Sequence, residues 1–259
     1  MKNYAQWPSY FAKYGRREPP DVTHTPMSFA WGHPDLLPWE VKALYPNYAI
    51  AFTKAMKSKQ MNGGDFKLVG PGSVFDMSWI GEIAATRSKN DSVIVDVGGG
   101  LGQLLQDVIR EIPAVSPTQC VLQDRGEVIN EAREVADKVL SEVVMMEHDF
   151  LTEQPIKGAT VYFLRRVLLD WPDRIAISIL KHLAQALPVD DGRARVIIME
   201  PGLDNDPSGM GHYIDMAMLQ LGGKMRNEKG FSKLVTAAGL KVVGYHNGGT
   251  DQVVVCARA

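Results

Sequence analysis

The sequence has little cysteine and no long hydrophobic run. Its 259 residues include 2 cysteines, Cys120 and Cys256, and both lie in apolar, strand-like runs. Such thiols suit a reducing compartment, so the chain is expected to be cytoplasmic. No stretch of about 18 apolar residues occurs, which argues against a membrane span. The first twenty residues also lack the apolar core of a signal peptide.

An excess of charge of either sign is also missing. Lysine and arginine total 28 against 30 acidic residues, a formal net charge of −2. Without a basic block, nucleic acid is not expected as a partner. Histidine, cysteine and acidic residues do not occur at metal-ligand spacing, so no metal is expected. The 45% hydrophobic and 22% charged content is typical of a globular protein that buries a substantial core.

Two stretches of different character divide the chain. Residues 1–88 are rich in aromatics and broken by prolines, which predicts a helical leader that covers a substrate site. Short helices are expected in it at 38–44, 48–56 and 73–85, the last capped by Ser73. Residues 89–259 form the second predicted domain.

Strands and helices alternate regularly in this second domain. Strands are predicted at residues 93–97, 120–123, 143–146, 160–163, 195–200, 240–245 and 252–257, and helices at 102–111, 127–141, 174–186, 210–219 and 228–238. The alternation predicts an α/β fold with a parallel, doubly wound sheet. Only a short polar loop joins the last two strands, so they are expected to form an antiparallel hairpin at one edge.

A glycine-rich loop follows the first predicted strand, in the run VIVDVGGGLG at residues 93–102. Gly98, Gly99 and Gly100 would let the backbone turn tightly and approach a ligand. Asp96 places a carboxylate at the strand end, where a ligand's amino group could use it. By itself such a loop also fits phosphate and dinucleotide binders, or a structural turn.

Acidic residues at the ends of the next two strands narrow the choice of ligand for this loop. Asp124, followed by Arg125, ends the second strand, where a carboxylate can accept hydrogen bonds from both ribose hydroxyls. Asp149 and Phe150 follow the third strand, where an acid can bind an adenine amino group and an aromatic ring can pack on the base. Acids at three successive strand ends fit a nucleoside without a pyrophosphate, which favours S-adenosylmethionine (SAM).

Six motifs in order resemble those of plant and fungal natural-product O-methyltransferases: VDVGGGLG, VLQDRGEVI, EHDF, FLRRVLLDWPD, VIIMEPGL and GGKMRN. The resemblance runs from about residue 25 to the C-terminus. It implies a class I SAM-dependent methyltransferase fold, Rossmann-like, with a seven-stranded, mostly parallel sheet. It also implies a set of residues that line the pocket of SAM or S-adenosylhomocysteine (SAH): Gly98, Gly99, Gly100, Asp124, Asp149, Phe150, Arg165 and, closing the adenine end, Trp171.

This resemblance also bears on assembly and substrate. Family members carry an N-terminal winged-helix dimerisation domain, which is not recognised in this sequence, so a monomer or a dimer through the leader is expected. The substrate is expected to be a small molecule, aromatic or polyketide-derived. The positions that match substrate-binding positions of the family are Phe52, Met56, Met216 and Gln220, although phenylalanine and methionine at helical spacing are equally typical of a core.

In this family the base that removes the acceptor's proton is a histidine directly before Asp-Trp, held by two glutamates. Here Leu169 stands at the histidine position and Met225 at one glutamate position, while Glu200 matches the other. Loss of a general base costs roughly 10²–10⁴ in rate. The resemblance thus implies a SAM site next to two apolar residues at the positions where the family carries its histidine base and one of the glutamates that hold it.

Several polar residues could still act there. Asp170 is mainly structural in the family, and His212, on a predicted helix, could face either the pocket or solvent. His24 and His33 in the leader could reach over the site, or only bind loop atoms.

Three functions remain open. The first, by analogy with pericyclases of this fold, is SAM-assisted chemistry without methyl transfer, such as dehydration or pericyclisation of a polyketide-derived substrate. The second is O-methylation of an acidic phenol or enol by proximity alone. The third is a non-catalytic relic that binds SAM or a partner. Leu169 and Met225 speak against the second, and the intact glycine loop speaks against a relic without a ligand.

Overall fold

The computed structural model describes residues 2–19, 21–51, 54, 67–203, 209–248 and 251–259. It consists of two compact units that interleave along the chain. Unit 1 comprises Met1–Phe66, Leu169–Pro172 and Leu203–Met225, and unit 2 comprises Lys67–Leu168, Asp173–Gly202 and Arg226–Ala259.

Unit 2 is built on a seven-stranded sheet in the order β3-β2-β1-β4-β5-β7-β6. The strands are β1 (Ile94–Val97), β2 (Cys120–Asp124), β3 (Val144–Glu147), β4 (Val161–Arg165), β5 (Arg195–Pro201), β6 (Leu240–Asn247) and β7 (Asp251–Arg258). The first five are parallel, whereas β7 runs antiparallel between β5 and β6. Both the parallel core and the edge hairpin predicted from the sequence are confirmed.

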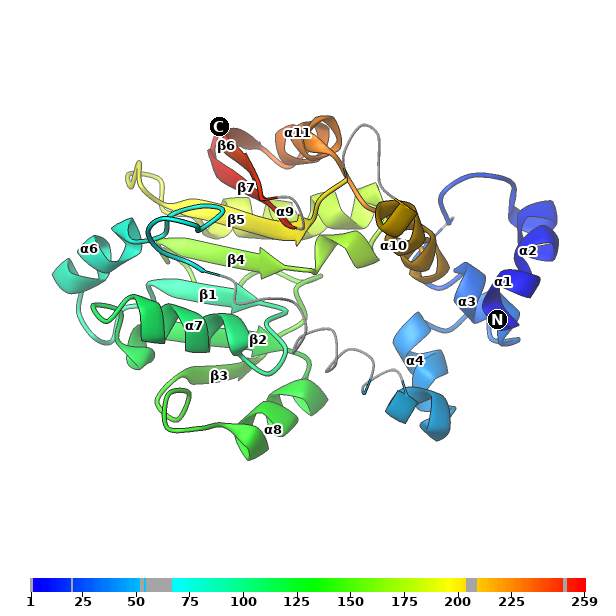
Figure 1. The fold of residues 1–259 in the computed structure, drawn as a ribbon, viewed down its shortest axis with the longest axis horizontal. Coiled ribbons are helices and arrows are strands. Elements are labelled where there is room, and N and C mark those ends of the chain that lie inside the picture. The colour runs from blue at the N-terminus through cyan, green and yellow to red at the C-terminus, as the bar shows by residue number, and fades with distance from the viewer. Residues whose placement is uncertain (1, 20, 52–53, 55–66, 204–208, 249–250) are drawn as a thin grey trace. The chain divides into compact units, whose positions relative to one another are not determined.

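Helices of unit 2 cover the two faces of this sheet. They are α6 (Trp79–Thr86), α7 (Gln103–Glu111), α8 (Gly126–Val135), α9 (Asp173–Ala186) and α11 (Glu228–Ala237), with a short 3₁₀ turn at Pro117–Gln119. The chain order explains the two layers, because right-handed crossovers that lead in opposite directions from the sheet centre place their helices on opposite faces. In Figure 1, α7 lies in front of the sheet and α9 behind it.

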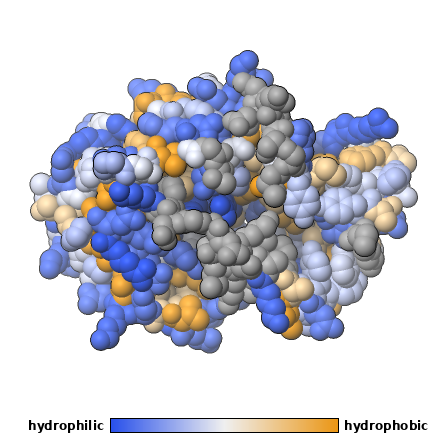
Figure 2. All heavy atoms as spheres, in the orientation of Figure 1, coloured by the Kyte–Doolittle hydropathy of each residue, from blue (hydrophilic) through white to orange (hydrophobic). Residues whose placement is uncertain are grey.

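The central strands are buried on both faces. All four residues of β1 are buried, and so are the first four of β2 and of β4. Buried, mostly apolar runs of this kind are typical of parallel strands covered by helices. On the face of unit 2 seen in Figure 2, hydrophilic residues predominate around α7 and α8, and apolar residues form small separate patches.

Unit 1 is helical. It contains α1 (Lys2–Ala5), α2 (Trp7–Tyr14), α3 (Pro26–Ala30), α4 (Pro38–Ala43) and α10 (Gly209–Leu221), and residues 46–51 are also helical. Prolines occupy the first turns of α3 and α4, where backbone N–H groups have no partner within the helix. Proline is favourable at this position because its nitrogen carries no hydrogen. Aromatic rings hold the helices together, and Tyr10 in α2 contacts Phe29 in α3 edge-to-face.

Two predicted helices differ from those observed. The helix predicted at 73–85 with Ser73 as its cap is wrong over residues 73–78, where Ser73 belongs to a turn in which its N–H donates to the Gly70 carbonyl. The helix α6 begins at Trp79. The helix predicted at 127–141 ends at Val135, and Asp137 then accepts the backbone N–H groups of residues 139 and 140. Such side-chain bonds compete with helix continuation.

No helix among the described residues is both long and apolar enough to cross a membrane. Residues 67–88, assigned to the leader from the sequence, pack within unit 2. The N–H groups of Leu68 and Val69 donate to the Glu111 carboxylate of α7 at 2.9 and 3.3 Å, which ties this segment to the sheet's helical layer.

Close packing at Gly99 generates a stability prediction. A Cβ on Gly99 would lie 2.3 Å from Asp96 Oδ2 and 2.6 Å from Leu122 Cδ1, so Gly99→Ala should lower the free energy of unfolding by about 2 kcal/mol in urea titrations. Gly192→Ala is the control, because no atom lies within 4 Å of its Cβ position. Equal stability of the two variants would contradict this packing.

Candidate active site

The glycine-rich loop begins directly after β1 in unit 2. Gly98 and Gly99 both donate their N–H groups to the Gln123 carbonyl, at 2.8 and 3.1 Å, which anchors the loop on β2. Gly100 has φ +61°, a left-handed conformation that favours glycine, and no atom of the described residues lies within 4 Å of where its Cβ would stand. At Gly100 the loop therefore presents its backbone to an open space.

Asp96 lies beneath this loop with an unsatisfied carboxylate. Its side chain is buried, and neither carboxylate oxygen has a hydrogen-bond partner among the residues that the structure describes. Burial raises the pKa of Asp96 to about 7; the charge of Arg165 opposes this rise and that of Asp124 adds to it. Because buried polar groups nearly always have partners, an orphaned carboxylate indicates a missing ligand or water.

Asp124 at the end of β2 is held by backbone donors. Its Oδ2 accepts the Gly100 N–H at 2.9 Å, and its Oδ1 accepts the Arg125 N–H at 2.8 Å. Burial raises the pKa of Asp124, and these two hydrogen bonds act in the opposite direction. The carboxylate thus joins the glycine loop to the next strand. Arg125 forms an exposed ion pair with Glu127 at 2.9 Å.

Phe150 and Arg165 reach the same edge of the sheet. A Cβ on Gly98 would lie 3.5 Å from the Phe150 ring, which places this ring beside the loop. Arg165 ends β4 and is partly buried. Asp149 is exposed, and its Oδ1 accepts the Leu151 N–H at 2.9 Å. Unit 2 therefore brings the glycine loop together with Asp96, Asp124, Phe150 and Arg165.

Glu200 at the end of β5 organises the backbone that leads to Leu169. Its buried Oε1 accepts the N–H groups of Val167 and Leu168, at 3.1 and 2.8 Å. Arg226 donates to the Leu168 carbonyl at 2.8 Å and to Asp173 at 2.9 Å. These bonds fix the entry to the 3₁₀ turn Leu168–Asp170.

Leu169 and Met225 lie on adjoining segments of unit 1, and both are buried. The Lys224 N–H donates to the Leu169 carbonyl at 2.9 Å. Between them Gly223 packs so tightly that a Cβ would lie 2.0 Å from the Leu169 oxygen. The Met225 N–H donates to Asp215 of α10 at 2.8 Å.

The other predicted site residues of unit 1 have varied surroundings. Burial raises the pKa of Asp170 to about 7, and Trp171 contacts the Trp39 ring edge-to-face at 5.2 Å. His212 is exposed on α10, and so is Met216, at 46%. Gln220 accepts a hydrogen bond from Asn3 at 2.6 Å. Phe52 and Met56 lie outside the described residues. The roles of all these residues stay predictions.

Sequence reasoning missed two carboxylates of unit 1. Asp215 binds the Met225 backbone, a contact between distant segments that no local pattern signals. Asp21 binds the His24 imidazole, and the D-x-x-H spacing of these two residues was the available signal. Among the residues that the structure describes, no three His, Cys or acidic side chains could together hold a metal ion.

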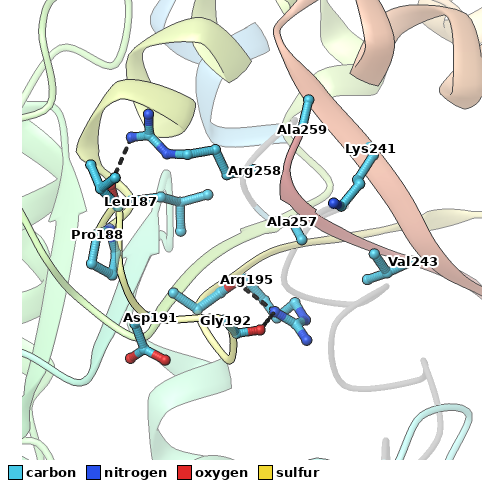
Figure 3. A pocket seen from close by; sticks show the side chains of 12 residues that line it. Leu187, Pro188, Asp191, Gly192, Arg195, Lys241, Val243, Ala257, Arg258 and Ala259 are labelled. Atoms are coloured by element: carbon cyan, nitrogen blue, oxygen red, sulfur yellow. Dashed lines mark hydrogen bonds between the residues drawn. The ribbon is translucent and has the colours of Figure 1, made fainter.

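A cavity of about 340 Å³ lies at the other end of the sheet (Figure 3). Arg195 at the start of β5 and Arg258 at the end of β7 line it, together with Lys241. Both arginines are tied to backbone carbonyls, Arg195 to Gly192 and Arg258 to Leu187. Since ligands of open α/β sheets bind at the carboxyl ends of parallel strands, this cavity is not the candidate site.

Comparison with known proteins decides the family. The model of the O-methyltransferase domain matches residues 81–241. The chain belongs to the O-methyltransferase domain family. The methyltransferase cfoD of Aspergillus candidus is 40% identical over 263 residues, which are 99% of this chain and 63% of that protein. The chain thus spans less than two thirds of this relative's length.

Solved structures agree with the O-methyltransferase fold. A pericyclic reaction enzyme has a TM-score of 0.81 at 23% identity, and LepI in complex with SAM has 0.80 at 22%. Each comparison covers 100% of this chain and 64% of the other. At such identities the likeness establishes the fold, and the family is one of SAM-dependent, methyltransferase-fold enzymes.

The observed loop fits the cofactor of this family. SAM carries a positive charge and a nucleoside, and the orphaned Asp96 carboxylate and the open space at Gly100 suit such a ligand. Asp124 binds the Gly100 N–H, and the charge of Arg165 acts on Asp96, so both residues belong to the surroundings of this loop.

A pH-dependent stability follows from the burial of Asp96. Between about pH 4 and 7 the folded carboxyl keeps a proton that the unfolded chain has lost, so stability should fall as pH rises through this range. Asp96→Asn should remove about 2 kcal/mol of that fall. Chemical denaturation at pH 5 and pH 8 measures it, with exposed Asp190→Asn as control. An unchanged difference in the Asp96 variant would refute the assignment.

Proposed function

We propose that this chain is the catalytic part of a SAM-dependent methyltransferase of fungal secondary metabolism. Its acceptor is an acidic hydroxyl, a phenol or an enol, on a small aromatic or polyketide-derived molecule. The relatives support methyl transfer, since cfoD, which matches almost the whole chain at 40% identity, is named a methyltransferase.

The observation that carries this proposal is the buried carboxylate of Asp96 beneath the glycine loop, which has no partner within the described ranges of the chain. Gly100 exposes backbone beside it, and Asp124 is fixed by two backbone N–H groups. SAM bound there would supply a methyl group on a sulfonium. The residues of unit 2 would hold its nucleoside and exclude water, with Phe150 beside the loop as an apolar wall.

The acidity of the acceptor follows from the residues at the expected base positions. Leu169 and Met225 are 6% and 4% exposed and carry no group that can take a proton. Without a base the barrier rises by about 3–5 kcal/mol, at 1.36 kcal/mol per decade of rate. An acceptor that ionises readily avoids most of this loss.

A second candidate rests on the same two apolar residues. If Leu169 and Met225 only shape the pocket, the enzyme could bind SAM and dehydrate or cyclise its substrate without methyl transfer. A pericyclic reaction enzyme shares this fold, but at 23% identity this similarity does not establish a shared activity. A non-catalytic relic is the least supported alternative, because cfoD, which matches almost the whole chain, is named a methyltransferase.

One experiment separates these functions. The protein is incubated with methyl-labelled SAM and a panel of phenols and enolised 1,3-dicarbonyl compounds of graded acidity, and the products are analysed by mass spectrometry. Labelled product is expected, in a yield that rises with acceptor acidity. Converted but unlabelled product would favour the second candidate, and no conversion with retained SAM binding would favour a relic.

A further inference from the structure

Another cavity, of about 380 Å³, lies in unit 2 on one face of the sheet, over β5, β7 and β6. A cavity of this size falls in the range of small-molecule sites. The glycine loop follows β1, which β4 separates from β5. The cavity is therefore separate from the candidate cofactor site, and an inference about its ligand does not rest on the proposed function.

The floor of this cavity is formed by residues that the strand register places side by side. Val255 of β7 pairs with Gly244 of β6 on one side and with Ile197 of β5 on the other. Arg195 lies two residues before Ile197, so its side chain points to the same face of the sheet as that of Val255. A β-bulge adds Val243 to this floor, and its side chain is 48% exposed. The floor thus presents apolar surface beside an arginine.

Aromatic side chains form one wall of the cavity. Phe75 and Trp79, from the segment that leads into α6, line it, and the Phe75 ring lies 4.8 Å from the His246 ring of β6. This segment packs on the hairpin, because a Cβ on Gly248 would lie 2.3 Å from Val74. The wall therefore offers flat apolar surfaces on which an aromatic ring can pack.

Two arginines, Arg193 and Arg195, give the cavity a positive charge. Arg195 donates through Nη1 to the carbonyls of Gly192 and Ala194, at 2.7 and 2.9 Å, which holds its guanidinium at the wall. The same guanidinium has further N–H groups on Nε and Nη2. Its planar shape matches a carboxylate, whose two oxygens it can bind together.

Among the described residues that line the cavity, none is acidic. The nearby Asp191 accepts the backbone N–H of Arg193 at 2.9 Å and forms an ion pair with Arg87 at 3.2 Å. Its charge is therefore compensated by a residue outside the cavity. An apolar cavity with two arginines and no acid is complementary to a flat, apolar ligand that is negatively charged at one end.

The position of Arg195 orients such a ligand. Arg195 and Val243 also line the cavity shown in Figure 3, so the two cavities adjoin at these residues. Lys241 and Arg258 line the cavity of Figure 3, and positive charge therefore continues on the far side of Arg195. The negative end of a ligand belongs at Arg195, and its apolar end belongs beside Phe75.

We infer that this cavity is a binding site for a small aromatic carboxylate. The aromatic ring of the ligand packs against Phe75 and Trp79 and on the valines of the floor. Its carboxylate binds the guanidinium of Arg195, with the charge of Arg193 beside it. The site lies wholly within unit 2, and binding there involves no chemical step.

Calorimetric titration with 2-naphthoate tests this inference. Arg193→Gln and Arg195→Gln should each weaken binding about tenfold, because each removes a charged partner of the carboxylate. Val243→Trp keeps both arginines but fills the floor, and should weaken binding by at least as much. Arg110→Gln is the control, because Arg110 lies on α7 in an exposed ion pair with Asp137, and this variant should bind like the wild type. Circular dichroism verifies that all variants are folded.

The neutral analogue 2-naphthamide separates charge from apolar packing. It carries the same ring without the negative charge, so the wild type should bind it at least tenfold more weakly than 2-naphthoate. Equal affinity for the two compounds would overturn the inference, and so would absence of 2-naphthoate binding by the wild type. Unchanged affinity in the Arg193, Arg195 and Val243 variants would also overturn it, because the ligand would then bind elsewhere, for example at an acceptor site.

Discussion

A buried carboxylate with no partner is the constraint on which the rest of this structure depends. Asp96 lies in the buried strand β1, shielded from water, and its oxygens bind no other residue in the described part of the chain. Its Oδ2 lies so close to Gly99 that this position has no room for a side chain. A protein keeps such a group at a cost to its stability, and binding of the proposed cationic ligand would offset this cost.

The two units carry different sets of the predicted site residues. Unit 2 carries the glycine loop with the carboxylates of Asp96 and Asp124, which would suit a nucleoside with a positive charge. Unit 1 supplies the apolar pair Leu169 and Met225 together with the leader. The chain passes between the units at Leu168, whose N–H binds Glu200 and whose carbonyl binds Arg226. Glu200 therefore binds the backbone of this turn, and this contact does not depend on which side chain residue 169 carries.

Much of the fold could be predicted from the sequence because its cues are local. Buried β-strands read as apolar runs, and the glycines after Val97 and the acid at Asp124 mark the ends where strands stop. The start of the helix predicted at Ser73 was wrong, because the Ser73 N–H donates to the Gly70 carbonyl in a turn. The end of α8 was missed because the Asp137 side chain accepts two backbone N–H groups that follow it. The pairing of Asp215 with Met225 joins distant segments, so no periodicity could signal it.

Calorimetric titration of the protein with SAH tests the central claim most directly, because it measures the nucleoside site without any acceptor. One SAH should bind per chain, and Asp124→Ala should weaken binding at least tenfold, since the Gly100 N–H would lose its partner. The exposed Asp190→Ala should bind like the wild type. Absence of SAH binding by the wild type, or equal affinity of the Asp124 variant, would contradict the assignment of the glycine loop as the cofactor site.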